Sequence, residues 1–117
     1  MENETKPTGA QVFVAFEVAL EVIRSLRDVV AKVRKHNRRI ADQIVEAASS
    51  IASNVEEGNR RAGKDRVYLF RVAAGSAAET RAQLRVALAW GWVEPTDIEP
   101  ALKHLDRELG LLWGLTR

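Results

Sequence analysis

The apolar residues of this chain recur at alternating spacings of three and four, which is typical of helices that pack in a bundle. The first series predicts a helix over residues 8–35, with capping-box spacing at Thr8–Gln11. Its seam comprises Val12, Phe16, Ala19, Ile23, Leu26, Val30 and Val33. A second apolar strip lies beside it, at Ala15, Val18, Val22 and Val29. Two strips on one helix predict packing on two sides, which favours an oligomer.

Three further helices are expected. Asn37 is a predicted N-cap for residues 38–58, with a seam at Ile40, Ile44, Ala47, Ile51, Asn54 and Gly58. A helix over residues 64–90 ends before Gly91, and its seam comprises Val67, Phe70, Ala74, Ala77, Leu84 and Leu88, interrupted by Arg81. The last helix begins at a capping box, Thr96–Glu99, and presents Ile98, Leu102, Leu105, Leu109 and Leu112.

Four long helices with short connections predict an all-α fold, an antiparallel up-down-up-down four-helix bundle. The length of 117 residues fits one domain with a core of its own. We expect a flexible N-terminal tail over residues 1–9 and a single four-helix-bundle domain over residues 10–117.

Composition narrows the possible chemistry. The chain has no cysteine, which excludes disulfides and thiolate metal sites and fits a reducing compartment. No apolar run approaches the roughly 20 residues of a membrane span, and the polar N-terminus does not resemble a signal peptide. We therefore expect a cytoplasmic protein with no membrane association.

The net charge is only +2, but the basic residues gather in two groups. The first comprises Arg34, Lys35, Arg38 and Arg39, and the second comprises Arg60, Arg61, Lys64 and Arg66. They are either ordinary solvated helix faces or sites that bind the phosphates of RNA or DNA. In an up-down bundle the two groups lie at opposite ends, and a ring of subunits would repeat each group around a rim.

Polar residues interrupt the apolar pattern of the second and third helices. They are Ser50, Ser53, Asn54, Glu57, Gly58, Gly75, Ser76 and Glu79. For five of them there are two interpretations: a polar pocket or a metal site, or, as we favour, a buried hydrogen-bond network that sets helix register. These five are Ser53, Asn54, Glu57, Ser76 and Glu79. For Gly75 we expect close contact with the small residues of the second helix, because glycine costs about 1 kcal/mol against alanine within a helix.

No catalytic constellation is visible. Neither His36 nor His104 follows a Glu or Asp by three residues, as a di-iron carboxylate bundle requires, and there is no H-E-x-x-H motif. We expect no enzyme activity, no catalytic or metal-binding residues and no cofactor. Trp90, Trp92 and Trp113 could be stacking platforms for bases, but tryptophans at bundle ends more often cap the core or fill an interface, and we expect packing here.

Two segments carry a family resemblance. Residues 50–61, S-I-A-S-N-V-E-E-G-N-R-R, and residues 69–79, L-F-R-V-A-A-G-S-A-A-E, resemble the two signatures of the four helix bundle proteins encoded within 23S rRNA intervening sequences. The similarity covers roughly residues 12–112. Ala52 stands where the family usually has proline, Arg60 replaces a small residue and Arg66 replaces an aromatic one.

The same family includes the accessory variability protein of diversity-generating retroelements. That relative implies a ring-shaped homopentamer with a basic surface that binds nucleic acid and a reverse transcriptase. We therefore expect a non-enzymatic homo-oligomer, a pentamer, that acts as a nucleic-acid-associated accessory protein. The alternative is a protein–protein adaptor with no direct nucleic-acid binding.

Overall fold

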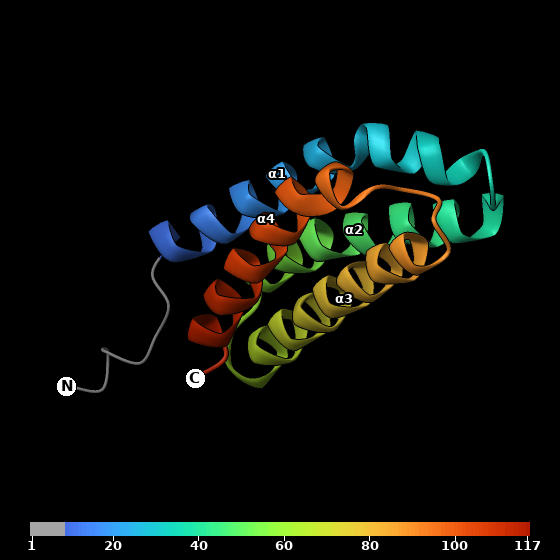
Figure 1. Cartoon of the computed structure of the whole chain (residues 1–117). Helices are drawn as coiled ribbons and strands as arrows, with labels where there is room; N and C mark the ends of the chain where they lie inside the picture. Colours follow the sequence, from blue (N-terminus) through green and yellow to red (C-terminus); the bar gives the residue numbers. More distant parts are fainter. Residues whose placement is uncertain (1–8) are drawn as a thin grey trace.

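The computed structural model describes residues 9–117, and all of its regular elements are helices (Figure 1). They are α1 (Gly9–Arg34), α2 (Arg38–Asn59), α3 (Gly63–Ala89) and α4 (Pro95–Leu115). The predicted all-α class is confirmed, as are the number and order of the helices. Of the expected tail, residues 1–8 lie outside the described part, and Gly9 is the first residue of α1.

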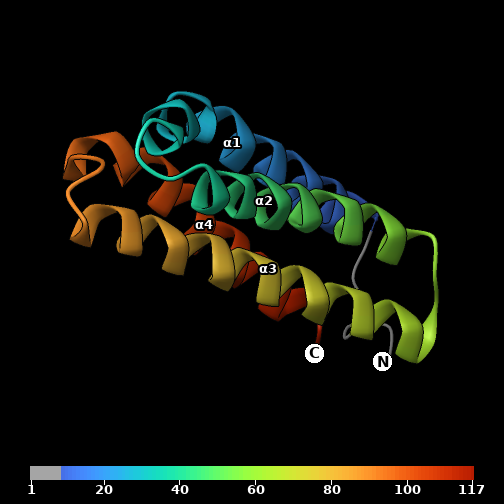
Figure 2. The same cartoon turned by 90° about the vertical axis from the view of Figure 1, so that its right-hand side faces the viewer.

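The helices run up, down, up and down, and each packs against two others. α1 contacts α2 and α4, and α3 contacts the same two helices. The α1–α2 and α3–α4 turns lie at one end of the bundle, whereas the α2–α3 turn and the C-terminus lie at the other (Figures 1 and 2). This arrangement brings residues 34–39 and 90–94 together, although they are far apart in the sequence.

Packing within one chain accounts for the doubled apolar strip of α1. Ala15, Val18, Val22 and Val29 are at most 3% exposed, because α1 has a neighbour on each side. Of the predicted seam, Phe16, Ile23 and Val30 are only half-buried. Packing against α2 and α4 therefore buries most of both apolar strips. The strips alone are not evidence for an oligomer.

The seams of α3 and α4 differ from those predicted. On α3 the buried positions are Phe70, Ala73, Ala77, Thr80, Leu84 and Ala87, so Thr80 lies in the core and Arg81 at the surface. On α4 they are Ile98, Ala101, Leu105, Glu108, Leu112 and Leu115. The sequence pattern favoured the larger residues Leu88, Leu102 and Leu109, but packing places small or polar neighbours in the interior.

The turn between α1 and α2 has the predicted cap, because the Asn37 side chain accepts a hydrogen bond from the Ile40 N–H at 2.9 Å. Gly91 adopts a φ of 77°, as expected for the residue after a helix.

The predicted start of α4 is wrong by two residues: its N-cap is Glu94, and Thr96 lies inside the helix. Pro95 favours the first helical position, and Asp97 accepts the Glu94 N–H at 2.8 Å. The proposed cap at Thr8 lies outside the described residues.

Candidate nucleic-acid interface

The α1–α2 turn carries the first basic group. Arg34 forms an ion pair with Asp42 at 2.6 Å, which neutralises part of its charge. Lys35, Arg38 and Arg39 are exposed and form no ion pair with any residue of the described chain. This turn therefore presents three cations that are available to an external anion; we call Lys35, Arg38 and Arg39 the turn cations.

The second group, at the α2–α3 turn, is largely occupied within the chain. Arg60 and Arg61 both bind the carboxylate of Glu57, at 2.8 and 2.7 Å. The hydrogen bond from Arg61, together with the charge of Arg60, lowers the pKa of Glu57. Two arginines that share one carboxylate have a smaller net positive charge, so they attract a phosphate less strongly than unpaired arginines do.

Arg66 and Lys64 complete that group, but their surroundings differ. The Arg66 guanidinium lies 5.6 Å from the centre of the Phe70 ring, and its Nε atom is buried without a hydrogen-bond partner. Lys64 is exposed. The structure therefore places the eight predicted cations at two separate ends of the monomer, and it leaves the turn cations as the larger unpaired cluster.

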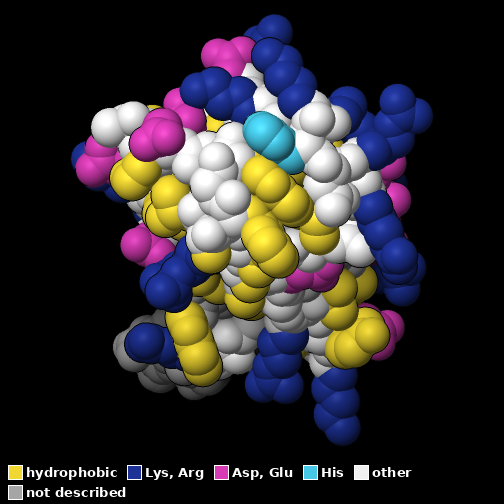
Figure 3. All heavy atoms as spheres, turned by 45° about the vertical axis from the view of Figure 1, so that its right-hand side comes forward, with side chains coloured by type: hydrophobic (Ala, Val, Ile, Leu, Met, Phe, Trp, Pro, Cys, Tyr) yellow, Lys and Arg dark blue, Asp and Glu magenta, His cyan; other side chains and the backbone are white. Residues whose placement is uncertain are grey.

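Figure 3 views the molecule almost along the bundle, onto the end that carries the α1–α2 and α3–α4 turns. Hydrophobic side chains gather in the middle of this face, and Lys and Arg side chains border them at the top and on the right. Acidic side chains are interspersed at the rim. This end of the molecule thus combines apolar surface with positive charge.

The predicted polar network forms only in part. Ser76 on α3 donates to the Ser50 hydroxyl on α2 at 2.9 Å, and Asn54 donates to the same hydroxyl at 2.9 Å and to the Ser50 carbonyl at 2.8 Å. Thr80, fully buried, donates to the carbonyl of Ser76 at 2.8 Å. Ser50, Asn54 and Ser76 therefore link the two helices as the structural interpretation requires.

The other signature residues lie apart from this network. Ser53 is exposed and donates only to the carbonyl of Ser50, at 3.3 Å. Glu57 pairs with arginines at the turn, and Glu79 is exposed without a partner in the described chain. The expectation that Ser53, Glu57 and Glu79 share one buried cluster is wrong, because Ser53 and Glu79 are exposed and Glu57 pairs with arginines at the α2–α3 turn. A second inter-helix link, Gln83 to Gln43 at 2.7 Å, was not foreseen.

The two signature glycines have different roles. Gly58 is buried, and a Cβ built there would lie 2.6 Å from Cε1 of Phe70. Gly75 is exposed, and a Cβ there would meet nothing within 4 Å. Close helix contact therefore explains Gly58, whereas the same explanation for Gly75 is wrong, and nothing in the structure accounts for a glycine at that position.

One core residue was missed altogether. Glu108 on α4 is fully buried, and neither of its carboxylate oxygens has a hydrogen-bond partner. Burial raises the pKa of this carboxyl to about 8. The signal was present in the sequence, since Glu108 continues the spacing of Leu105, Leu112 and Leu115, but an acidic residue was excluded from the seam by its type.

An aromatic stack at the same end as the turn cations was also missed. The Trp92 ring stacks with His36, with ring centres 6.1 Å apart, and with Trp90, with centres 6.0 Å apart. Trp92 packs against the core, as expected, but Trp90 and Trp113 are each 69% exposed. The predicted role in packing therefore holds for Trp92. It does not account for Trp90 and Trp113, which remain exposed.

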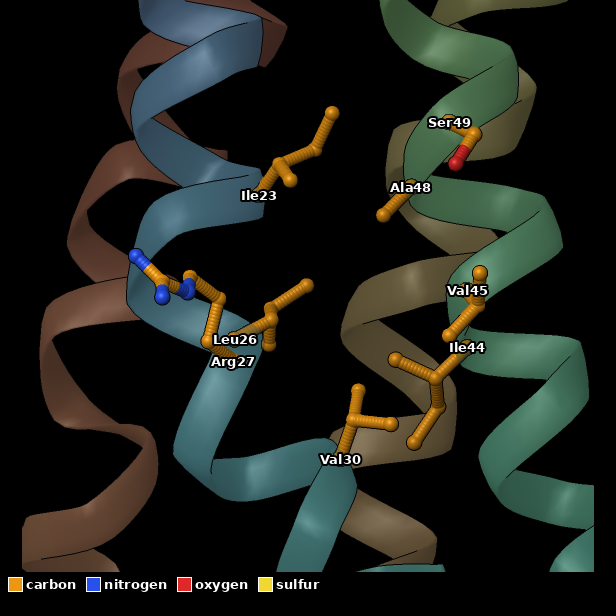
Figure 4. A pocket seen from close by; sticks show the side chains of 8 residues that line it. All are labelled: Ile23, Leu26, Arg27, Val30, Ile44, Val45, Ala48 and Ser49. Carbon is orange, nitrogen blue, oxygen red and sulfur yellow. The ribbon is translucent and has the colours of Figure 1, made fainter.

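A shallow apolar groove of about 260 Å³ lies between α1 and α2. Figure 4 shows Ile23, Leu26 and Val30 of α1 facing Ile44, Val45 and Ala48 of α2, while the Arg27 guanidinium turns away. Val45 is 42% exposed, and Ile23 and Val30 are half-buried. The groove is thus an apolar surface that α1 and α2 do not close between themselves.

Within residues 9–117 no three His, Asp or Glu side chains are grouped so that they could hold a metal ion. None of the helices of this segment is both long and apolar enough to cross a membrane.

The fold and its signature network define a small α-helical bundle of a known class. Residues 13–114 match the sequence profile of the 23S rRNA-intervening sequence protein, and the chain belongs to this family. A solved structure from Bacteroides thetaiotaomicron, described as a protein with unknown function from the S23 ribosomal protein family, has a TM-score of 0.78 to this chain. It is 16% identical, and the match covers 88% of this chain and 98% of that one, so it supports the fold alone. No curated protein matches the chain.

Proposed function

We propose that this protein is a non-enzymatic, homo-oligomeric nucleic-acid-associated bundle whose α1–α2 turn binds the phosphate groups of RNA or DNA. The observation that carries the proposal is the contrast between the two basic groups. Arg60 and Arg61 are held by Glu57, whereas the turn cations are exposed and unpaired. Unpaired surface cations are what a phosphate backbone requires, because binding gains from the release of condensed counterions.

Catalysis forms no part of the proposal. The carboxyl with a strongly raised pKa, Glu108, would be the natural candidate for a general acid or base. It is fully buried, so a substrate would not reach its oxygens without opening the bundle. A structural role in the core suits this residue better than a catalytic one.

The proposed binding is tested with labelled RNA and DNA oligonucleotides, titrated by fluorescence anisotropy between 50 and 200 mM salt. Replacing Lys35, Arg38 and Arg39 with glutamine should weaken binding and reduce the salt slope by about 2, since each contact to a single strand contributes roughly 0.7. A matched control removes the same charge elsewhere, with Arg71, Arg85 and Lys103 changed to glutamine; these residues are exposed and unpaired in the described chain.

Equal losses in the two triple variants would show that net charge matters and the α1–α2 turn does not, which would refute the proposed site. If the wild-type protein binds neither nucleic acid at 50 mM salt, the second candidate takes its place. That candidate is a protein–protein adaptor for a larger enzyme such as a reverse transcriptase. The exposed aromatic side chains of Phe13 and Tyr68 favour it, because they offer apolar contact surface that does not depend on the turn cations.

A further inference from the structure

The aromatic stack joins three segments at one end of the bundle. His36 belongs to the α1–α2 turn, Trp90 ends α3, and Trp92 belongs to the α3–α4 turn. Both ring pairs are nearly parallel, with interplanar angles of 6° for His36 and 13° for Trp90 against Trp92. Trp92, which packs against the core, contacts both of the other rings and so links the stack to the bundle.

Trp90 contributes little to packing within the bundle. It is 69% exposed, although burying a side chain of this size would contribute strongly to stability. Its ring stacks with Trp92, and most of its surface faces water. A flat and exposed aromatic ring is the feature on which proteins stack unpaired bases.

Positive charge adjoins this ring system. Lys35, His36 and Trp92 line a hollow of about 280 Å³, together with Lys32, Glu94 and Asp97. Asp97 is occupied, since it accepts from Lys32 at 2.8 Å and from the Glu94 N–H at 2.8 Å. Lys35 is therefore the unpaired cation of the hollow, and Glu94 is the acid left to oppose it.

We propose that this end of the molecule binds single-stranded nucleic acid, with an unpaired base stacked on Trp90 and the adjoining phosphates held by the turn cations. The inference rests on the proposed function and specifies its ligand. Bases in a duplex are already stacked on both faces, so a stacking platform selects unpaired RNA or DNA, whereas phosphate contacts alone do not.

The test compares a 12-nucleotide oligouridine, the oligodeoxyuridine of the same length and a duplex of equal length, titrated by anisotropy against wild-type protein and three variants. Trp90→Ala should weaken binding to both single strands roughly 5- to 150-fold and leave the weaker duplex binding unchanged. Trp90→Phe should restore part of the loss. Trp113→Ala is the matched control, because Trp113 is equally exposed but lies near the opposite end of the bundle.

Unchanged single-strand affinity in Trp90→Ala overturns the inference, as does a larger loss in Trp113→Ala. Trp90→Ala could leave binding unchanged while the triple glutamine variant of the turn cations loses it. That result would support the proposed phosphate site and refute the stacking platform. Absence of binding by the wild-type protein refutes both. A difference between oligouridine and oligodeoxyuridine, which share the same base, decides whether RNA or DNA is the preferred source of the unpaired base. Circular dichroism of each variant shows whether the bundle remains folded.

Discussion

The ring of Phe70 on α3 lies against the backbone of Gly58 on α2, so closely that a Cβ at position 58 would be 2.6 Å from Cε1 and 2.9 Å from Cδ1. Phe70 is fully buried and cannot swing away into solvent. The contact sets how closely α2 and α3 approach near their shared turn. It also explains why one signature glycine of this family is required by packing in this chain.

Gly58→Ala should therefore destabilise the bundle, by about 1–3 kcal/mol, because the added methyl group overpacks the α2–α3 contact. Gly75→Ala is the internal control. Its site is exposed and helical, so alanine should stabilise by up to about 1 kcal/mol through helix propensity. Urea unfolding of both variants measures the difference. Equal effects of the same sign at the two positions would contradict this account of Gly58.

The Ser76–Ser50 hydrogen bond should couple α3 to α2. A double-mutant cycle with Ser50→Ala and Ser76→Ala is expected to give a coupling free energy of about 0.5–1.5 kcal/mol. Ser53→Ala, three residues along the same helix but exposed, should change stability by less than about 0.5 kcal/mol. A coupling near zero would mean that Ser50 and Ser76 do not hold the two helices in register.

Glu108 should make the stability of the protein depend on pH. Its pKa is about 8 in the folded protein and near 4.5 in the unfolded chain, so the folded state holds an extra proton between these values. The free energy of unfolding should consequently fall as pH rises from about 5 to 8, by up to about 1.4 kcal/mol per pH unit. Asp97, whose pKa is lowered chiefly by its hydrogen bond with Lys32, acts with the opposite sign and only at acidic pH.

Glu108→Leu provides the check on this assignment. Leucine removes the two unpaired carboxylate oxygens and keeps a similar volume, so the variant should be more stable than wild type at pH 8 and should lose the decline between pH 5 and 8. Urea unfolding at several pH values measures both effects. Parallel pH profiles for the two proteins would show that Glu108 is not the titrating group.

The homo-oligomer stays a prediction, and the groove between α1 and α2 is the surface on which we expect a second copy to pack. Val45→Glu places a charge in that groove and should convert the assembly to monomers. Val86→Glu is a close control, since Val86 on α3 is 40% exposed against 42% for Val45. Light scattering at micromolar concentration measures the mass. A monomeric wild-type protein, or equal disruption by both variants, would rule out this interface.

The four helices, their order and the family could all be predicted from the amino-acid sequence. Apolar spacing, the Asn37 cap and Gly91 report local conformation, which depends on neighbours within a few residues. The two family signatures, at residues 50–61 and 69–79, can likewise be recognised in the sequence without a structure. The start of α4 was misplaced because Pro95 and Asp97 favour a cap at Glu94, two residues before the one that the capping-box pattern indicated.

Which face of each helix is buried, and which polar groups contact one another, could not be predicted from the sequence, because both depend on how the helices pack. Glu108 is fully buried whereas Leu109 is only half-buried, because the inward direction depends on the neighbouring helices and not on residue type alone. Arg60 and Arg61 follow Glu57 by three and four residues, but only the structure shows that both pair with it and that the turn cations are the larger unpaired cluster. The stack of His36, Trp92 and Trp90 joins residues more than 50 positions apart, which are brought together only when the α1–α2 and α3–α4 turns meet at one end of the bundle.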